Sequence, residues 1–162
     1  MSNRNLIISD IDTFLQLDEE QGESLESITF KNIDLTYDFY EHRRVLWHIP
    51  SIHFTNCRLG EGVEFFTLLN SCYPEKLSIV NCGLTARDLS GVFCLLPQEV
   101  WFLDFSGNNL GAQKPSTLDI LKGRRIYIRF LDLRNNNYTD DARRGIIEYQ
   151  KRPLTLIREI KL

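Results

Sequence analysis

The sequence predicts a single α/β domain built as a solenoid, with short parallel strands on one face and helices on the other. Three observations support this prediction. The composition is that of an ordinary globular domain, one pattern of apolar residues recurs at a nearly constant interval, and helix-forming segments fill the gaps between its copies. Self-similarity at a period of about 20–50 residues is the signature of a repeat architecture, in which each unit packs against its neighbours.

The composition fits one folded domain. Of the 162 residues, 43% are hydrophobic and 25% are charged, which excludes a disordered chain. No apolar run approaches the roughly 18–20 residues of a membrane-spanning helix. The apolar run at 6–8 ends at Ser9 and Asp10, which is too short for a secretory signal. We therefore expect no membrane partner and a cytoplasmic location, or delivery into a host cell by a non-classical secretion route.

Cysteine usage indicates a reducing compartment. The four cysteines stand in apolar neighbourhoods, at Cys57, Cys72, Cys82 and Cys94. No Cys-x-x-Cys pair is present, so the thiols do not predict a zinc site. Without a secretory signal, four free thiols are favoured over two disulfides.

One template recurs five times along the chain. It reads apolar, two residues, apolar, one residue, apolar, two residues, then Asn, Cys or an apolar residue, one residue, apolar. The clearest copy starts at Val100 and includes Leu103, Phe105, Asn108 and Leu110. The second apolar position of the copies falls at Ile28, Ile52, Leu77, Leu103 and Leu131. The intervals of 24, 25, 26 and 28 residues predict strands aligned in register.

These copies resemble the leucine-rich-repeat family, over about residues 25–160. The segments 103–110 and 82–89 are most similar to the ribonuclease-inhibitor-like subclass. The resemblance implies a right-handed α/β horseshoe arc, with a parallel sheet on the concave face and helices on the convex face. It also implies a protein-binding role, without naming the partner.

The repeat divides the single domain, 1–162, into three parts. We expect an N-terminal capping helix within 1–24, five repeats over 25–150 and a C-terminal capping strand within 151–162. The capping helix is placed at 11–21. Further helices are expected at 37–47, 61–72, 86–96, 114–121 and 139–150.

The exposed strand positions predict where a partner binds. The last two regular repeats place aromatic residues and arginines on the sheet face, and these residue types are enriched at binding hot spots. The candidate protein-binding residues are His53, Lys76, Trp101, Phe102, Asp104, Arg129, Phe130, Asp132 and Arg134. We expect a non-enzymatic interaction module, with no cofactor and no metal ion, that serves as a cytosolic regulator or a bacterial effector.

A competing interpretation concerns the segment 6–13. Its apolar run followed by Asp10, Asp12 and Thr13 resembles the first motif of haloacid-dehalogenase-like phosphatases. In that family the first Asp is the nucleophile and the second the general acid, beside a magnesium ion. The alternative that we favour is that Asp10 or Asp12 caps the first helix, because the following chain is committed to the repeat.

Charge is distributed unevenly. Residues 1–112 contain 7 Lys and Arg against 16 Asp and Glu, whereas residues 113–162 contain 12 against 6. The net charge of −3 argues against a nucleic-acid partner, although the C-terminal part is basic. We expect a monomer, with salt-dependent head-to-tail self-assembly as an alternative. The histidines His42, His48 and His53 share no metal-ligand spacing.

Overall fold

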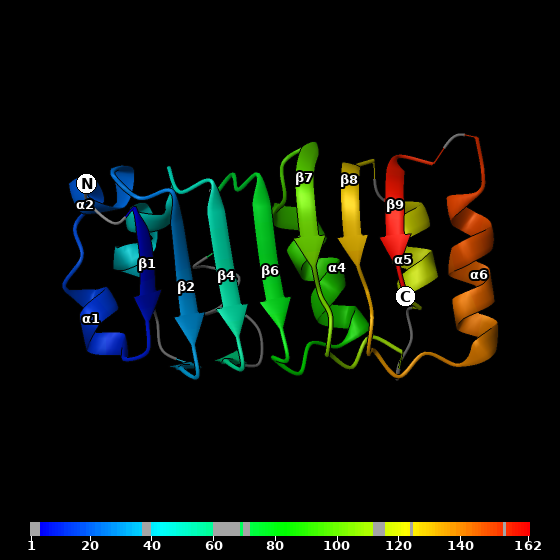
Figure 1. Cartoon of the computed structure of the whole chain (residues 1–162), viewed down its shortest axis with the longest axis horizontal. Helices are drawn as coiled ribbons and strands as arrows, with labels where there is room; N and C mark the ends of the chain where they lie inside the picture. The colour runs from blue at the N-terminus through cyan, green and yellow to red at the C-terminus, as the bar shows by residue number, and fades with distance from the viewer. Residues whose placement is uncertain are drawn as a thin grey trace.

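A parallel sheet of seven strands runs the length of the molecule (Figure 1). The computed structural model describes residues 4–36, 40–59, 69, 72–111, 116–123, 125–153 and 155–162. The strands are β1 (Asn5–Ile8), β2 (Ser27–Lys31), β4 (Ser51–Thr55), β6 (Lys76–Val80), β7 (Glu99–Asp104), β8 (Tyr127–Asp132) and β9 (Ile157–Lys161). They lie side by side in chain order, so each strand pairs with the next one along the chain. A two-stranded parallel sheet, β3 (Asp34–Leu35) with β5 (Arg58–Leu59), follows β2 and β4.

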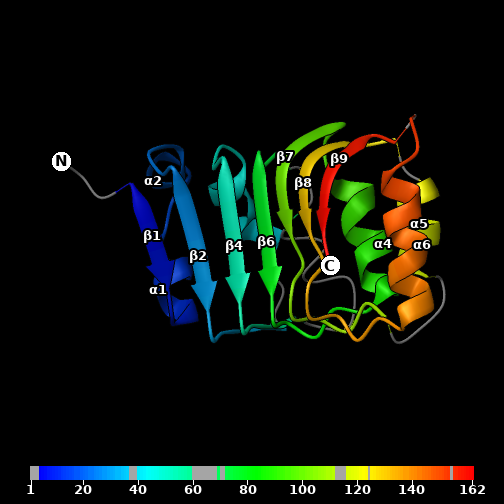
Figure 2. The same ribbon diagram turned by 45° about the vertical axis from the view of Figure 1, so that its right-hand side comes forward.

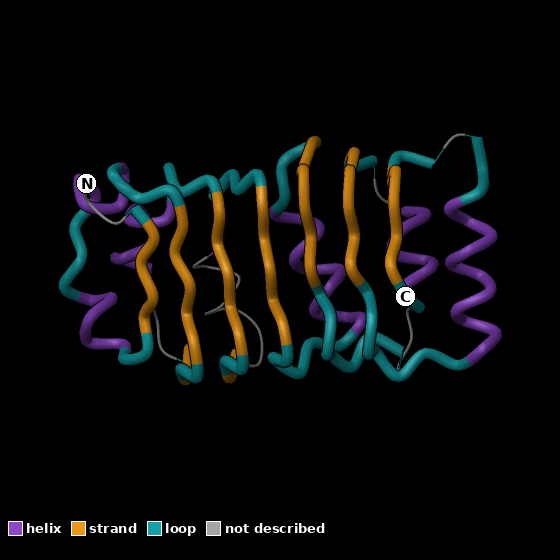
Figure 3. Tube along the Cα trace, viewed as in Figure 1, coloured by secondary structure: helices purple, strands orange, loops and turns teal. Residues whose placement is uncertain are grey.

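The described helices lie on one side of this sheet, and none of them covers its other face, which we call the open face (Figure 2). They are α1 (Ile11–Leu15), α2 (Glu19–Glu23), α4 (Ala86–Leu95), α5 (Thr117–Gly123) and α6 (Asp140–Gln150), with a 3-10 helix η1 (Tyr40–Leu46). Figure 3 shows the same alternation of strand and helix along the chain. The fold is therefore α/β with a parallel sheet, as the sequence predicts.

Strand register follows the repeat. Ile28 pairs with Ile52, Ile52 with Leu77, Leu77 with Leu103, and Leu103 with Leu131. All five side chains are buried. The in-register alignment that the intervals predict is thus confirmed. These five side chains form one buried apolar row across neighbouring strands.

Five of the seven strands, β2, β4, β6, β7 and β8, leave the sheet through the same left-handed turn. The residues with positive φ at this point are Asn32 (57°), Asn56 (53°), Asn81 (54°), Gly107 (70°) and Asn135 (59°). Asn and Gly adopt this conformation at low cost. The first four donate their backbone N–H to the next repeat, at Thr55, Val80, Ser106 and Arg134 oxygens, over 3.0–3.2 Å. The turn therefore repeats in hydrogen bonding as well as in shape.

The asparagines that follow the last two turns bind backbone groups inside the molecule. Asn108 and Asn136 are buried, and the Nδ2 atom of Asn108 donates to the carbonyls of Ile79 (2.6 Å) and Phe105 (2.9 Å). Cys57 occupies the same position in an earlier repeat, where its thiol donates to the Phe30 carbonyl at 3.3 Å. The Asn or Cys position of the repeat template therefore satisfies backbone groups at the turn.

An aromatic stack fills the N-terminal end of the core. The Phe30 and Phe54 rings are parallel, with centroids 5.0 Å apart, and the Phe14 ring meets Phe30 edge-on at 5.0 Å. All three are fully buried. Phe14 comes from α1, so this stack attaches the N-terminal segment to the sheet.

The N-terminal segment differs from its prediction. The single helix expected at 11–21 is two short helices, α1 and α2, and β1 precedes them in the sheet. Asp18 divides the helices because its side chain accepts a bond from the Gln21 N–H and starts a new helix there. The segment 6–8 pairs with 28–30, since an apolar strand satisfies the backbone groups of β2 as well as covering its core.

The other helices agree with their predictions to different degrees. Those expected at 86–96 and 139–150 are α4 and α6, capped by Thr85 and Thr139. The helix expected at 114–121 is α5, which begins at Thr117. Residues 114 and 115 of the expected segment lie outside the described part of the chain. Of the helix expected at 37–47, the 3-10 helix η1 covers Tyr40–Leu46, and 37–39 lie outside the described residues. The helix expected at 61–72 also lies outside them, except for 69 and 72. The C-terminal strand is present as β9, paired with β8.

All four cysteines are free thiols, as expected. Cys57 and Cys72 are buried, and burial raises the pKa of Cys72 to about 12. Cys94 is an exception to the apolar surroundings expected from the sequence, because it is exposed on α4. Among the described residues, no helix is long and apolar enough to cross a membrane.

Candidate functional site

Four of the candidate residues gather on the open face of β7 and β8. We call them the aromatic–arginine patch: Trp101, Phe102, Arg129 and Phe130. Phe102 pairs in register with Phe130. Trp101 is 46% exposed, and the other three are half-buried.

The repeat template explains why two consecutive side chains face outward on each of these strands. In β7 the buried residues are Val100 and Leu103, three positions apart, so Trp101 and Phe102 between them both reach solvent. Strict alternation would bury one of them. The same spacing in β8 exposes Arg129 and places it beside Trp101, because the two strands keep one register throughout.

Arg129 is held by ring contacts. Its guanidinium carbon lies 3.8 Å from the Trp101 ring centroid and 5.5 Å from that of Phe130. Its Nε atom is buried and has no hydrogen-bond partner among the described residues, and no carboxylate there lies within ion-pair distance of it. A planar cation fixed on aromatic faces, with its charge unpaired, is a binding group for a carboxylate or a backbone carbonyl.

A small hollow adjoins the patch toward β9. It has a volume of about 30 Å³ and is lined by Phe102, Phe130, Leu131, Asp132, Glu159 and Lys161. That volume holds a water molecule or a methyl group, so it suits the tip of a side chain rather than a small-molecule ligand. Glu159 and Lys161 were not among the predicted site residues, because the C-terminal strand departs from the repeat template.

Asp132 and Arg134 bind each other. The Arg134 Nε donates to both Asp132 carboxylate oxygens at 3.0 Å, and Nη2 donates to one of them at 2.6 Å. Burial acts to raise the pKa of Asp132, but the hydrogen bonds and charge of Arg134, with the charge of Lys161, outweigh it and lower the pKa. Asp104, in the equivalent position, accepts the Ser106 N–H at 2.9 Å. These three predicted contact residues therefore stabilise the turns after the strands.

His53 and Lys76 lie on the same face as the patch but at different distances from it. Lys76 is exposed and pairs in register with Phe102, so it borders the patch. His53 lies on β4, with β6 between it and β7. Burial lowers the pKa of His53, the charge of Lys76 lowers it further, and Asp104 opposes them.

The lowered pKa of His53 predicts an acid-sensitive fold. Protonation costs more in the folded chain than in the unfolded one, where the pKa is 6.5, so the folded state is destabilised as pH falls below that value. We expect His53→Gln to lose less stability than the wild type between pH 7.5 and 5.5 in urea unfolding. Thr29→Gln changes the residue paired with His53 on β2 without removing a titratable group, so it is the control and should behave as the wild type does. Equal losses in wild type and His53→Gln would contradict the prediction.

Asp10 caps α1. Its carboxylate accepts hydrogen bonds from the Asp12 N–H (2.9 Å), the Thr13 N–H (3.2 Å) and the Thr13 hydroxyl (2.5 Å). The Thr13 hydroxyl, then the Asp12 N–H, lower the pKa of Asp10. The preference for a helix cap is confirmed, and Asp10 rather than Asp12 is the capping residue.

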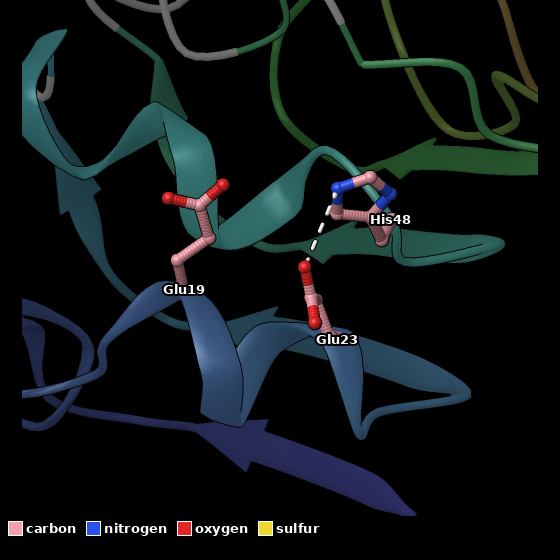
Figure 4. Close-up of side chains that lie close together, drawn as sticks. All are labelled: Glu19, Glu23 and His48. Atoms are coloured by element: carbon pink, nitrogen blue, oxygen red, sulfur yellow. Dashed lines mark ion pairs between the residues drawn. The ribbon is translucent and has the colours of Figure 1, made fainter.

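A second cluster joins residues that are distant in sequence: Glu19, Glu23 and His48 (Figure 4). One possible ligand atom from each lies within 4.8 Å of the others, and the His48 Nε2 is 3.8 Å from a Glu23 carboxylate oxygen. Imidazole and carboxylate are ligand types that Zn²⁺ accepts, although structural zinc sites have four. Gly22 brings the groups together, since a β-carbon there would lie 2.2 Å from the Val45 oxygen of η1. Sequence spacing gave no signal of this cluster.

Comparison with known protein families and with curated proteins finds no match to this chain. The function proposed for the chain therefore depends on the geometry of its own residues.

Proposed function

We propose that the chain is a leucine-rich-repeat solenoid of the ribonuclease-inhibitor-like subclass that binds a protein partner on the open face of its sheet. Three features support the repeat assignment: strands in chain order, one register across the repeats, and a left-handed turn at the same position of five of them. In such an array each unit contacts mainly its neighbours, and the stacked strands form an extended binding surface.

The observation that carries the binding proposal is the Arg129 guanidinium, which is stacked on Trp101 and forms no ion pair with any described residue. Aromatic residues and arginine contribute most of the binding energy at protein interfaces, and such residues cluster near the centre of the contact. Lys76 on one side and the pair Glu159 and Lys161 on the other supply a polar border. An apolar centre with a polar rim is the usual anatomy of an interface.

The proposed role is non-enzymatic and needs no cofactor. It suits a cytosolic regulator or a bacterial effector that works by holding another protein. No helix of the described residues covers the open face of the sheet, which leaves room there for the partner (Figure 2).

Replacing Trp101, Phe102 and Phe130 together by alanine is expected to abolish partner binding. Loss of hot-spot residues costs about 2 kcal/mol or more each. The fold should persist, because the buried residues of these strands are unchanged. The measurement is affinity capture with quantitative mass spectrometry, followed by a direct titration of the captured protein.

The matched control is Ile147→Ala, which removes an exposed apolar side chain, 42% accessible, from α6 on the other side of the sheet. It should bind as the wild type does. A triple variant that remains folded by circular dichroism and retains full affinity would refute the proposed surface. Loss of folding in the triple variant would show that the patch is part of the core.

A further inference from the structure

A groove lies at the C-terminal end of the molecule, away from the aromatic–arginine patch. Its volume is about 700 Å³. The lining residues are Lys122, Arg125, Tyr149, Arg152, Pro153, Thr155 and Leu156. They come from the C-terminal ends of α5 and α6 and from the segments leading into β8 and β9, which Figures 1 and 2 both place together.

The charge of this groove is entirely positive. Lys122, Arg125 and Arg152 are exposed, and none lies within ion-pair distance of a carboxylate in the part of the chain that the structure describes. No acidic side chain is among the lining residues. Two neighbouring cations, Arg144 on α6 and Lys151 just after it, are neutralised, because Arg144 pairs with Asp141 and Lys151 with Glu148.

Stabilisation of helix ends explains only part of this arrangement. Lys122 lies in the last turn of α5, where a cation interacts favourably with the helix dipole. Arg125 and Arg152 lie beyond the last residues of α5 and α6, outside those turns. Three cations that form no ion pair with any described residue repel each other around this groove, and a bound anion would remove this repulsion.

The rest of the lining is mostly apolar, and two of its residues are held in place. The Tyr149 hydroxyl donates to the Leu121 carbonyl at 3.1 Å, which fixes its ring against α5. Pro153 has a fixed φ, and Leu156 is 39% exposed although it is a large apolar residue. The Thr155 hydroxyl is buried without a hydrogen-bond partner among the described residues. Apolar walls with a few polar groups, enclosing about 300–1,000 Å³, are typical of small-molecule sites.

We propose that this groove binds a small organic anion, in which an aromatic or acyl body lies against Tyr149, Pro153 and Leu156. Its phosphate or carboxylate is held by Arg125 and Arg152, with Lys122 adding charge. Arginine suits this role because its planar donors match the oxygens of both anions. The site is independent of the proposed protein-binding surface.

The test uses 1-naphthyl phosphate as the probe, with 1-naphthol and inorganic phosphate as its two halves. Isothermal titration of the full chain should show binding of the phosphate ester, and at least tenfold weaker binding of either half. The double variant Arg125→Ala with Arg152→Ala should bind the ester about tenfold or more weakly, since hydrogen bonds to a charged group are lost. Arg143→Ala is the matched control, an exposed arginine on α6 outside the groove, and should bind unchanged.

The position of the probe is checked by amide chemical-shift mapping. Shifts concentrated at 121–126 and 149–157 support the proposal. Equal affinity of the double variant and Arg143→Ala would overturn it, as would binding of 1-naphthol as tight as that of the ester. Shifts confined to the open sheet face would assign the probe to the aromatic–arginine patch and would also overturn it.

Discussion

Replacing Asn108 by leucine is expected to lower the free energy of unfolding by about 4 kcal/mol. The Asn108 Oδ1 accepts the N–H groups of Cys82 (3.0 Å) and Leu84 (3.1 Å), and its Nδ2 donates to the Ile79 and Phe105 carbonyls. Leucine has a similar size and forms none of these bonds. Each buried donor that loses its acceptor costs about 1–3 kcal/mol.

The measurement is urea unfolding followed by circular dichroism. Asn5→Ala is the control, because this exposed side chain accepts a single hydrogen bond, from the Ser27 hydroxyl at 2.7 Å, and its loss should cost about 0.5 kcal/mol or less. A loss below about 1 kcal/mol in Asn108→Leu would mean that the turn satisfies its backbone groups without this side chain.

Replacing Phe30 by alanine is expected to cost about 3–5 kcal/mol, at the other end of the molecule. Phe30 is fully buried and lies between two rings, stacked on Phe54 and edge-on to Phe14. Its loss leaves a cavity where β1, α1 and the repeats meet. We expect the segment 5–15 to separate from the sheet before the rest unfolds, because Phe14 is the buried side chain of α1.

Hydrogen exchange with mass spectrometry checks whether the segment 5–15 separates first. Urea unfolding measures the decrease in the free energy of unfolding. Phe30→Leu is the matched control, since it retains an apolar side chain and loses mainly the ring contacts, at about 1–1.5 kcal/mol. If Phe30→Ala exposed β8 and β9 as early as β1, the core would unfold as one unit, contrary to the expected local separation.

Asn108 and Phe30 belong to different repeats, and together they indicate how the binding surface is supported. The Asn108 bonds connect the turn after β7 to the preceding repeat, and β7 carries Trp101 and Phe102. Loss of Asn108 is therefore expected to disturb the aromatic–arginine patch. Loss of Phe30 acts at β2, which β4 and β6 separate from β7 in the sheet order, and is expected to leave the patch in place.

Much of the sheet was predictable from the sequence because its buried apolar residues recur at nearly regular intervals. Intervals of 24–28 residues between apolar positions determine which residues pair, and Phe102 and Phe130 are neighbours for this reason alone. The spacing from Val100 to Leu103 likewise predicts that Trp101 faces outward. Thr85 and Thr139 mark the starts of α4 and α6, since a capping side chain acts within its own turn.

The left-handed turns carried a signal that could have been found. Asn stands at 32, 56, 81 and 135, and Gly at 107, at the same position of each repeat. Both residue types favour positive φ. This column of residues marks the end of every repeat strand directly.

The sequence alone determined the α/β class and the strand register, because both depend on residues at regular spacing in one chain segment. Asp132, which was expected on the exposed face of the sheet, is buried. Only the tertiary structure decided three other features: β1 joins the sheet, Arg129 stacks on Trp101, and Asp132 is neutralised by Arg134. It also assembled the basic groove from two helix ends and two loops. Such features depend on packing between segments and side-chain direction, and neither leaves a periodic trace in the sequence.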